Sequence, residues 1–421
     1  MAQSGERLHR ALLQAYKQRH LNSLSWLAAE SALALAAAGS DAPLAGLPLV
    51  VKDNIDVAGM PTSIGTALLA EEPVSHSAEL IVRLQQAGAI IIGKANMHEL
   101  ASGTSGLNAA RGDVRHPFLP GRVVGGSSSG SAAAVAAGIV PASIGTDTGA
   151  SVRLPASFCG LIGFRPSLLR YPQQGIAPIS LSRDTAGILA QRMDDVLALD
   201  SAISGESDHP TVALADLRLG VPRAHFWHGC EPAVAAAAEA VLQQLRDRGV
   251  TLIEVEIAQV AQLAVQAGYP LASFEMLRDL PRYLQQRGSQ YSFAELKQAV
   301  QSPDVQALLA DAATVSMEQY HAAITHWKPL LTARYQAVFQ QHQLDGLIFP
   351  TVPLLPPPPA KANTLFRQLI ANCEPATVVG LPCISLPLAQ TPDGIPVGIE
   401  LQFAAGEDRR LLAVASVLLA R

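Results

Sequence analysis

Short apolar runs alternate along the chain with stretches in which apolar residues recur at helical spacing. The runs are bounded by glycine, proline or polar residues, a pattern that predicts buried strands. We expect these strands at residues 49–51, 89–96, 139–144, 347–349, 379–388 and 397–401, with shorter ones inside 170–190, 217–227 and 250–260. The turn Pro392-Asp393-Gly394 predicts that the last two of the main strands form a hairpin.

Helical spacing is clearest over residues 75–87, where Leu80, Ile81 and Leu84 fall on one face. Other helices are expected within 6–38, where 26–38 is interpreted as a packed helix, and over 194–203 and 408–419. A helix is also expected to start at residue 97 and to give way to a Gly/Ser/Thr loop by 108. The stretch from 231 to about 342 is mostly helical in pattern.

Composition favours a globular protein and excludes several classes. Of 421 residues, 49% are apolar and 15% charged, which implies a sizeable core. The net charge of −5, without blocks of like charge, gives no indication of nucleic acid or an anionic membrane as a partner. The amphipathic N-terminus is unlike a secretory signal, and no run approaches the roughly 18 apolar residues of a spanning helix.

The four cysteines, Cys159, Cys230, Cys373 and Cys383, are scattered and form no metal-binding pattern. We therefore expect reduced thiols in a cytoplasmic protein, with no metal and no cofactor.

Residues 125–167 carry the most specific chemistry. Two glycines and three serines, Ser127, Ser128 and Ser129, lead into an alanine-rich helix, and an apolar strand then leads into a second polar loop at 145–151. Glycine-rich turns let successive N–H groups point one way, as a developing oxyanion requires. A flexible linker is the alternative, but linkers lack an interleaved helix and strand.

Lys52 directly follows the apolar run at residues 49–51. By spacing alone it is more simply a surface residue at a strand end. If its ammonium is desolvated, however, its pKa falls and the neutral amine can act as a base.

The stretches GGSSSGSAAAVAAG and GTDTGASVRLPASFCGLIGFRPS resemble the signature of the amidase signature family, which hydrolyses carboxamides through a Ser–Ser–Lys triad. The resemblance implies that Ser151 is the nucleophile. It places the bridging serine, which follows a cis peptide bond in relatives, at Ser127, because 151 − 127 = 24 is the family's interval. The triad lysine falls on Lys52, in LVVKDNIDVAG.

The resemblance also implies the fold: an α/β protein in which a large mixed sheet is covered by helices on both faces of a single α/β/α unit. We therefore expect a single domain over residues 1–421. Its parts are a signature core at 49–200, a largely helical specificity region at 231–342, and C-terminal strands and a helix at 345–421.

The implied mechanism is amide hydrolysis through an acyl-enzyme on Ser151, with Ser127 relaying protons to Lys52. The expected oxyanion donors are the backbone N–H groups of Thr148, Gly149, Ala150 and Ser151. Ser128, Asp147 and Arg153 are expected to support the site, and recognition of substrate charge is the alternative for the last two. Ala150 stands where most relatives have glycine, which narrows the pocket or strains a left-handed turn.

Two other groups near residue 94 invite different interpretations. Gly88, Gly93 and Lys94 imitate part of a phosphate-binding loop, but Ala95 occupies the hydroxyl position, so a buried strand is favoured. His98 lacks the motif of a Ser-His-Asp triad, and a structural role is favoured.

The segments MHELA and VRHPF resemble the indoleacetamide and mandelamide hydrolase branch of the family, where the loop with Gly103 and Thr104 approaches the substrate. We expect an amidase acting on a small-molecule amide, and a homodimer is possible. The alternatives are a subunit that hydrolyses glutamine for a partner enzyme and a non-catalytic scaffold. The sequence names no particular amide, and Tyr269, Phe274, Tyr283 and Trp327 are either pocket lining or core.

Overall fold

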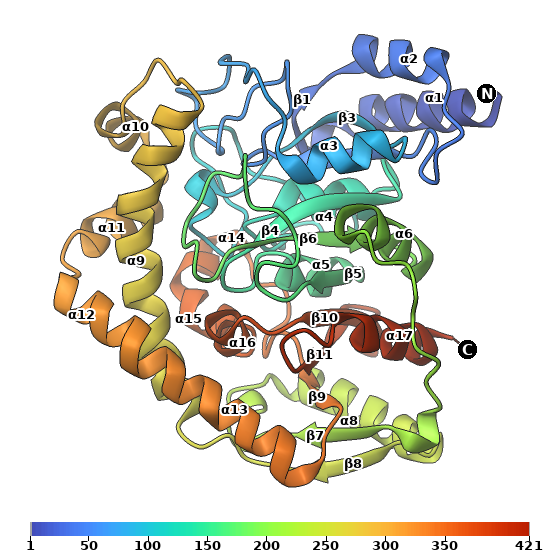
Figure 1. Ribbon diagram of the computed structural model, residues 1–421, viewed down its shortest axis with the longest axis vertical. Coiled ribbons are helices and arrows are strands. Elements are labelled where there is room, and N and C mark those ends of the chain that lie inside the picture. The colour runs from blue at the N-terminus through green and yellow to red at the C-terminus, as the bar shows by residue number, and fades with distance from the viewer. Residues whose placement is uncertain (1, 421) are drawn as a thin grey trace.

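A computed structural model describes residues 2–420. Eleven strands form one mixed sheet in the order β1-β3-β2-β4-β6-β5-β10-β11-β9-β7-β8 (Figure 1). The strands are β1 (Leu24–Leu27), β2 (Pro48–Lys52), β3 (Ile90–Ala95), β4 (Ala142–Asp147), β5 (Ile162–Arg165), β6 (Thr185–Ala190), β7 (Arg218–Val221), β8 (Thr251–Glu254), β9 (Gly346–Pro350), β10 (Cys383–Gln390) and β11 (Pro396–Phe403). β2 runs parallel to β3 and β4, whereas β4 and β6 are antiparallel.

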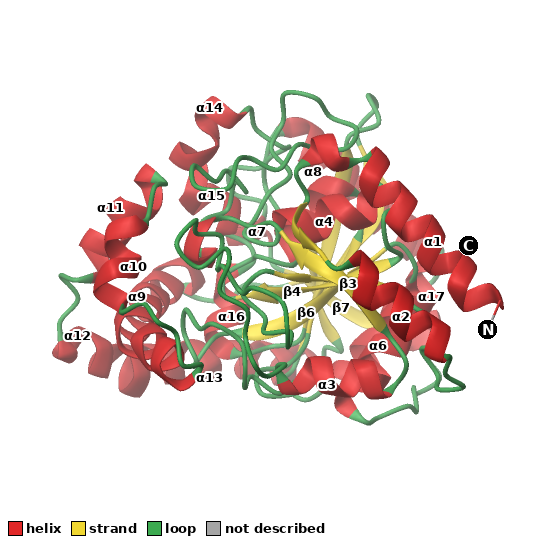
Figure 2. Cartoon of the chain, turned by 90° about the horizontal axis from the view of Figure 1, so that it is seen from above, coloured by secondary structure: helices red, strands yellow, loops and turns green. Residues whose placement is uncertain are grey.

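Helices surround the sheet, whose strands fan out at the centre in Figure 2. They are α1 (Ala2–Lys17), α2 (Ala29–Ala38), α3 (Glu79–Gln86), α4 (Ser129–Ala136), α5 (Arg153–Cys159), α6 (Met193–Ser204), α7 (Arg223–Phe226), α8 (Pro232–Asp247), α9 (Val260–Gln286), α10 (Phe293–Ala299), α11 (Pro303–Ala312), α12 (Met317–Ala322), α13 (Lys328–His342), α14 (Pro359–Ala362), α15 (Phe366–Ile370), α16 (Glu374–Val379) and α17 (Asp408–Leu419). The α/β fold expected from the sequence is confirmed, while its division into parts stays a prediction.

Alternating side chains of the central strands enter two cores. Leu49 and Val51 of β2 belong to one core together with residues of α3, α6, α8 and α17, whereas Val50 belongs to the other, with residues of α1, α2, α4 and α5. Successive side chains of a strand point to opposite faces, so both faces of the sheet are covered. Because both faces are buried, every position of β2 can be apolar, which explains why an uninterrupted apolar run forms this strand.

Helices α9 to α13 form a separate helical layer beside the sheet, seen as the yellow and orange ribbons of Figure 1. α9 and α13 pack against Leu347 and Phe349 of β9. α9, α10 and α11 pack over the loop that follows β3, through residues such as Met97 and Leu100. This layer brings residues from the chain's second half over the expected active site.

Several boundaries differ from the sequence-based expectations. Trp26 lies in β1, so the helix expected from residue 26 begins only at Ala29. The strand expected from 379 begins at Cys383, because 374–379 form α16. The expected helix start at 97 is only a short 3-10 turn, Glu99–Ala101.

Within residues 2–420, no helix is both long enough and apolar enough to cross a membrane. In the same range, no cluster of three or more His, Cys, Asp or Glu side chains is placed to hold a metal ion.

Candidate active site

Lys52 ends β2, a strand with neighbours on both sides, and its side chain is fully buried. Nζ lies 2.7 Å from Oγ of Ser127 and 2.7 Å from Oγ1 of Thr146. Burial lowers the pKa of Lys52 to about 7, although the charges of Asp147 and Asp184 oppose this shift. A neutral amine is therefore available near neutral pH.

Ser127 lies in a tight turn before α4. Its peptide bond with Gly126 is cis, as the resemblance implied. A Cβ at Gly126 would lie 2.8 Å from the backbone N of Gly106, so only glycine fits this position. The N–H of Gly126 donates to the carbonyl of Thr104 at 2.7 Å, which joins the turn to the loop after β3.

Ser151 stands at the end of the loop between β4 and α5. Its carbonyl accepts a hydrogen bond from the N–H of Ser128 at 3.3 Å, so the two serine-bearing loops are in contact. Ser151 lines a cavity, whereas the side chains of Lys52 and Ser127 are fully buried. Ser151 therefore faces the cavity, and Lys52 and Ser127 are not among the residues that line it.

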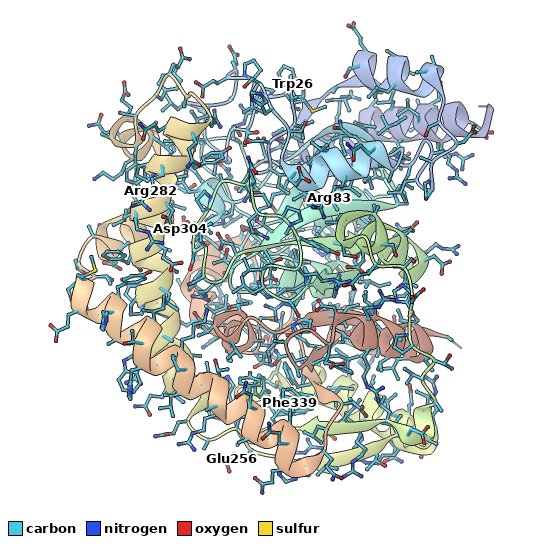
Figure 3. The ribbon with its side chains drawn as sticks, viewed as in Figure 1. Trp26, Arg83, Glu256, Arg282, Asp304 and Phe339 are labelled. Atoms are coloured by element: carbon cyan, nitrogen blue, oxygen red, sulfur yellow. The ribbon has the colours of Figure 1, made fainter. Side chains whose placement is uncertain are left out.

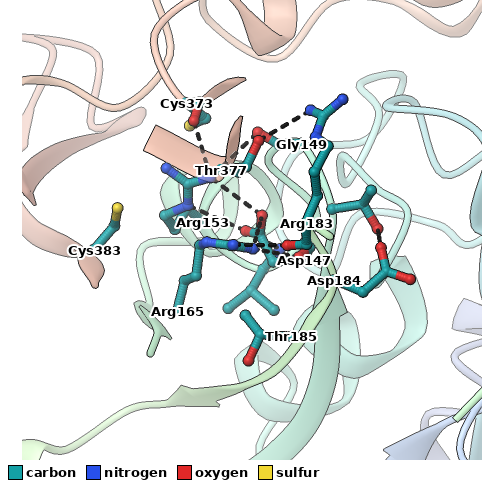
Figure 4. Close-up of polar contacts among 12 residues, drawn as sticks. Asp147, Gly149, Arg153, Arg165, Arg183, Asp184, Thr185, Cys373, Thr377 and Cys383 are labelled. Carbon is teal, nitrogen blue, oxygen red and sulfur yellow. Dashed lines mark hydrogen bonds and ion pairs between the residues drawn. The ribbon is translucent and has the colours of Figure 1, made fainter. Parts of the chain in front are cut away.

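Asp147 and Arg153 form a buried two-point ion pair, with Nε to Oδ2 and Nη2 to Oδ1 both at 3.1 Å (Figure 4). Burial alone would raise the pKa of Asp147, but the charges of Arg153 and Arg165 lower it to about 2. Arg153 also donates to the carbonyl of Gly149 at 3.2 Å and to Glu400. The charges of Asp147 and Arg153 are already paired with groups of the protein itself. This pairing favours their role in supporting the site over recognition of substrate charge.

Asp184 was missed by the sequence analysis. Asp184 is labelled in Figure 4. Its Oδ1 accepts a 2.6 Å hydrogen bond from the hydroxyl of Thr148, and its Oδ2 accepts from the backbone N–H groups of Ile179 and Ser180. Burial raises its pKa to about 6. No local motif marks this residue, because its partner Thr148 lies 36 positions away.

Ala150 is packed beneath the cavity against residues such as Leu154 and Phe158, and it also lines the cavity wall. The φ angle of Ala150 is not positive, so the strained left-handed turn considered from the sequence does not occur.

The cavity above Ser151 has a volume of about 380 Å³. Gly103, Thr104, Thr148, Gly149 and Ala150 form the wall around the serine. The more distant wall comes mainly from the helical layer and from α15. Its apolar members are Ile179, Tyr269, Ala272, Met276, Ala307, Leu308, Phe366 and Ile370. Its polar and charged members are Arg183, Ser273, Asp304, Asp311, Asn363, Arg367 and Glu374.

Of the four aromatic residues singled out in the sequence, only Tyr269 lines this cavity. Phe274 stacks on Tyr320, Tyr283 donates to Asp56 at 2.6 Å, and Trp327 packs against the core of the helical layer.

Lys94 is fully buried, with Nζ 3.2 Å from Oδ1 of Asp53 and 2.9 Å from the carbonyl of Pro61. Burial lowers its pKa. Lys94 therefore binds two residues, Asp53 and Pro61, of the segment that follows Lys52. Lys94 itself lies in β3, so the buried strand is the correct interpretation of the stretch that imitates a phosphate-binding loop.

The chain matches the family model described as Amidase over residues 7–412. It is 39% identical to the indoleacetamide hydrolase of Allorhizobium ampelinum over 383 residues, which is 88% of this chain and 83% of that protein. It is also 39% identical to the mandelamide hydrolase of Pseudomonas putida over 406 residues, or 91% and 80% of the two chains.

Solved structures give the same picture. A crystal structure of an amidase superimposes with a TM-score of 0.87 at 31% identity, over 99% of this chain and 96% of that chain. The peptide amidase of Stenotrophomonas maltophilia gives 0.86 at 28% identity, over 99% and 93%.

Proposed function

The chain belongs to the amidase signature family and is an amidohydrolase that cleaves carboxamide C–N bonds, and on this premise we propose that Ser151, Ser127 and Lys52 are its catalytic triad. The observation that supports this proposal best is that the buried Nζ of Lys52 lies 2.7 Å from Oγ of Ser127, while Ser151 lines the cavity. The relatives described above give no support to the glutamine-hydrolysing alternative.

In the first half-reaction, Oγ of Ser151 attacks the amide carbonyl carbon. The proton of Ser151 moves to Ser127, whose own proton moves to the neutral Nζ of Lys52. The resulting oxyanion accepts hydrogen bonds from backbone N–H groups among residues 148–151. The C–N bond then breaks as Lys52 returns the proton through Ser127 to the departing nitrogen, which leaves as ammonia or an amine.

Water completes the cycle. It attacks the ester carbonyl of the acyl-enzyme while its proton passes through Ser127 to Lys52. When the second oxyanion collapses, the bond to Ser151 breaks and the carboxylic acid is released. The proton held by Lys52 returns through Ser127 to Oγ of Ser151, and the enzyme is restored.

The substrate that we propose is a primary amide of a small arylacetic acid. Support comes from the apolar members of the far wall of the cavity and from relatives named as indoleacetamide and mandelamide hydrolases. An aromatic acyl group would remove apolar wall surface from water, which favours binding by about 25 cal/mol for each Å² buried.

We also propose a single domain and a cytoplasmic location. All four cysteines are free thiols, three of them buried. Disulfides are uncommon in the cytoplasm, so this state agrees with that compartment. A homodimer stays a prediction from the sequence.

Ammonia release from indoleacetamide, mandelamide, phenylacetamide and glutamine tests the proposal. The wild type should hydrolyse at least one aryl amide, and Ser151→Ala should lower kcat at least about a thousandfold. Ser129→Ala is a matched control, since this buried hydroxyl has no hydrogen-bond partner among residues 2–420. Full turnover by Ser151→Ala would refute the nucleophile, and a preference for glutamine would refute the substrate class.

A further inference from the structure

The first turn of α11 is fastened to the loop that follows β3. The buried carboxylate of Glu99 accepts hydrogen bonds from the backbone N–H of Ser302 at 2.7 Å and of Gln301 at 3.1 Å. These residues directly precede α11. Free N–H groups at a helix start need such acceptors, so Glu99 fixes where α11 begins.

His98, the neighbouring residue, connects this attachment to the reaction centre. Its backbone N–H donates to the carbonyl of Ser127 at 3.2 Å. Its ring is fully buried beneath Gly103, where a Cβ would lie 2.1 Å from Nε2. Nε2 lies 3.0 Å from Oδ2 of Asp304, although the contact is not aligned as a linear hydrogen bond.

Asp304 belongs to the helical layer (labelled in Figure 3) and lines the same cavity as Ser151. Its side chain is 28% exposed. Burial opposes ionisation, but His98 and backbone N–H groups at the start of α11 lower the pKa of Asp304 below its ordinary value. An ionised carboxylate can only accept hydrogen bonds. Met276 and Leu308 line the cavity beside it, and the other charged or amide side chains of the lining are Arg183, Asp311, Asn363, Arg367 and Glu374.

We infer that Asp304 is a specificity-determining residue that accepts a hydrogen bond from an N–H or O–H group on the acyl part of the aryl amide. This inference rests on the proposed function. A ligand that lacks such a donor would strip water from the carboxylate without replacing its hydrogen bonds, and sites of this kind reject such ligands strongly. The buried His98 contacts this carboxylate, with Nε2 3.0 Å from Oδ2, and does not itself line the pocket.

Two donors fit this chemistry: the ring N–H of an indole, and a hydroxyl on the carbon next to the amide carbonyl. Matched substrate pairs separate them. Indoleacetamide is compared with its benzothiophene analogue, in which sulfur replaces the ring N–H, and mandelamide is compared with phenylacetamide. Steady-state kcat and KM are measured for the wild type, Asp304→Ala and Asp304→Glu.

The wild type should favour the donor-bearing member of one pair by about tenfold or more in kcat/KM. Asp304→Ala should abolish that preference by impairing only the donor-bearing substrate, chiefly through KM. Asp304→Glu should restore part of the preference. Asp393→Asn, in the exposed turn between β10 and β11, controls for the loss of one negative charge and should keep the preference.

Phenylacetamide separates failure of this inference from failure of the proposed function. If the folded wild type hydrolyses no aryl amide, the proposed function is wrong. If it hydrolyses phenylacetamide but treats both members of each pair equally, only the role of Asp304 is wrong. A preference that survives in Asp304→Ala, or that is lost instead in Asp311→Asn, which lines the cavity from the C-terminal end of α11, would also overturn it.

Discussion

The hydroxyl of Thr148 donates a 2.6 Å hydrogen bond to the carboxylate of Asp184. The other oxygen of the same carboxylate is held by the N–H groups of Ile179 and Ser180. This bond fixes the first residue of the loop that ends at Ser151, where the oxyanion donors are proposed.

Asp184→Asn should therefore impair the chemical step. The amide oxygen can still accept from the two backbone N–H groups, but the NH₂ group then faces Thr148, whose hydroxyl loses its acceptor, and the loop would shift. We expect kcat to fall about 10- to 100-fold, with a smaller change in KM, because one misplaced oxyanion donor has effects of this size. Steady-state kinetics on an accepted aryl amide measures this.

Thr148→Val removes the other partner of the same bond. It should resemble Asp184→Asn, and the double variant should be little worse than either single variant. Thr185→Val is the control, because the Thr185 hydroxyl donates only to the carbonyl of Ala186. Additive losses in the double variant would contradict a shared role.

The pH dependence of kcat/KM should follow Lys52. Only the neutral amine accepts a proton, and burial places the pKa of Lys52 at about 7. Activity should therefore rise about tenfold per pH unit below pH 7 and level off above it. A rate that is flat from about pH 5 to 8, measured with the chemical step limiting, would exclude Lys52 as the base.

Lys52→Met should separate activity from stability. We expect kcat to fall at least about a thousandfold. The folded-state pKa of Lys52 is lower than the unfolded value, so protonation disfavours the fold as pH falls through the interval between 10.5 and about 7. The variant lacks this penalty, and thermal unfolding near pH 7 should show a Tm at least equal to that of the wild type. A much lower Tm would show that the amine stabilises the fold.

Asp147→Asn should destabilise the protein by about 3 to 5 kcal/mol, because it leaves buried arginines without their partner. The pKa of Asp147 is lowered from 3.8 to about 2, so its ionised form stabilises the fold above about pH 4 and this contribution is lost as pH falls to about 2. Denaturant unfolding should show the difference between wild type and variant shrinking by about 2 kcal/mol over that interval. A difference that is independent of pH would contradict the assignment.

The sequence predicted the features whose signals are local. The run at residues 139–144 indicated β4, whose side chains are all buried, but the strand starts at Ala142 and continues to Asp147, into the segment expected as a loop. Lys52 required the family resemblance, because spacing alone favoured the surface. β1 was missed, since it is an edge strand in which Trp26 and Leu27 are largely exposed and the alanines that follow continue the apolar pattern.

Contacts between distant segments could not be predicted in the same way. The contact of His98 with Asp304 spans 304 − 98 = 206 positions, and neither residue lies in a motif that names the other. The sequence indicated that the helical region sets specificity, but only the packing of α9 and α11 over the loop after β3 shows which of its residues reach the cavity.

The attachment of α11 limits how this enzyme can be recombined. Glu99 holds Ser302 across 203 positions, so the docking point of the helical layer is encoded in the half of the chain that carries Lys52, Ser127 and Ser151. A chimaera that imports a foreign α9–α11 segment must also import compatible residues at positions 98 and 99. Without them the grafted helices lack the hydrogen bonds that position α11. The chimaera would then not acquire the new selectivity, even with Lys52, Ser127 and Ser151 unchanged.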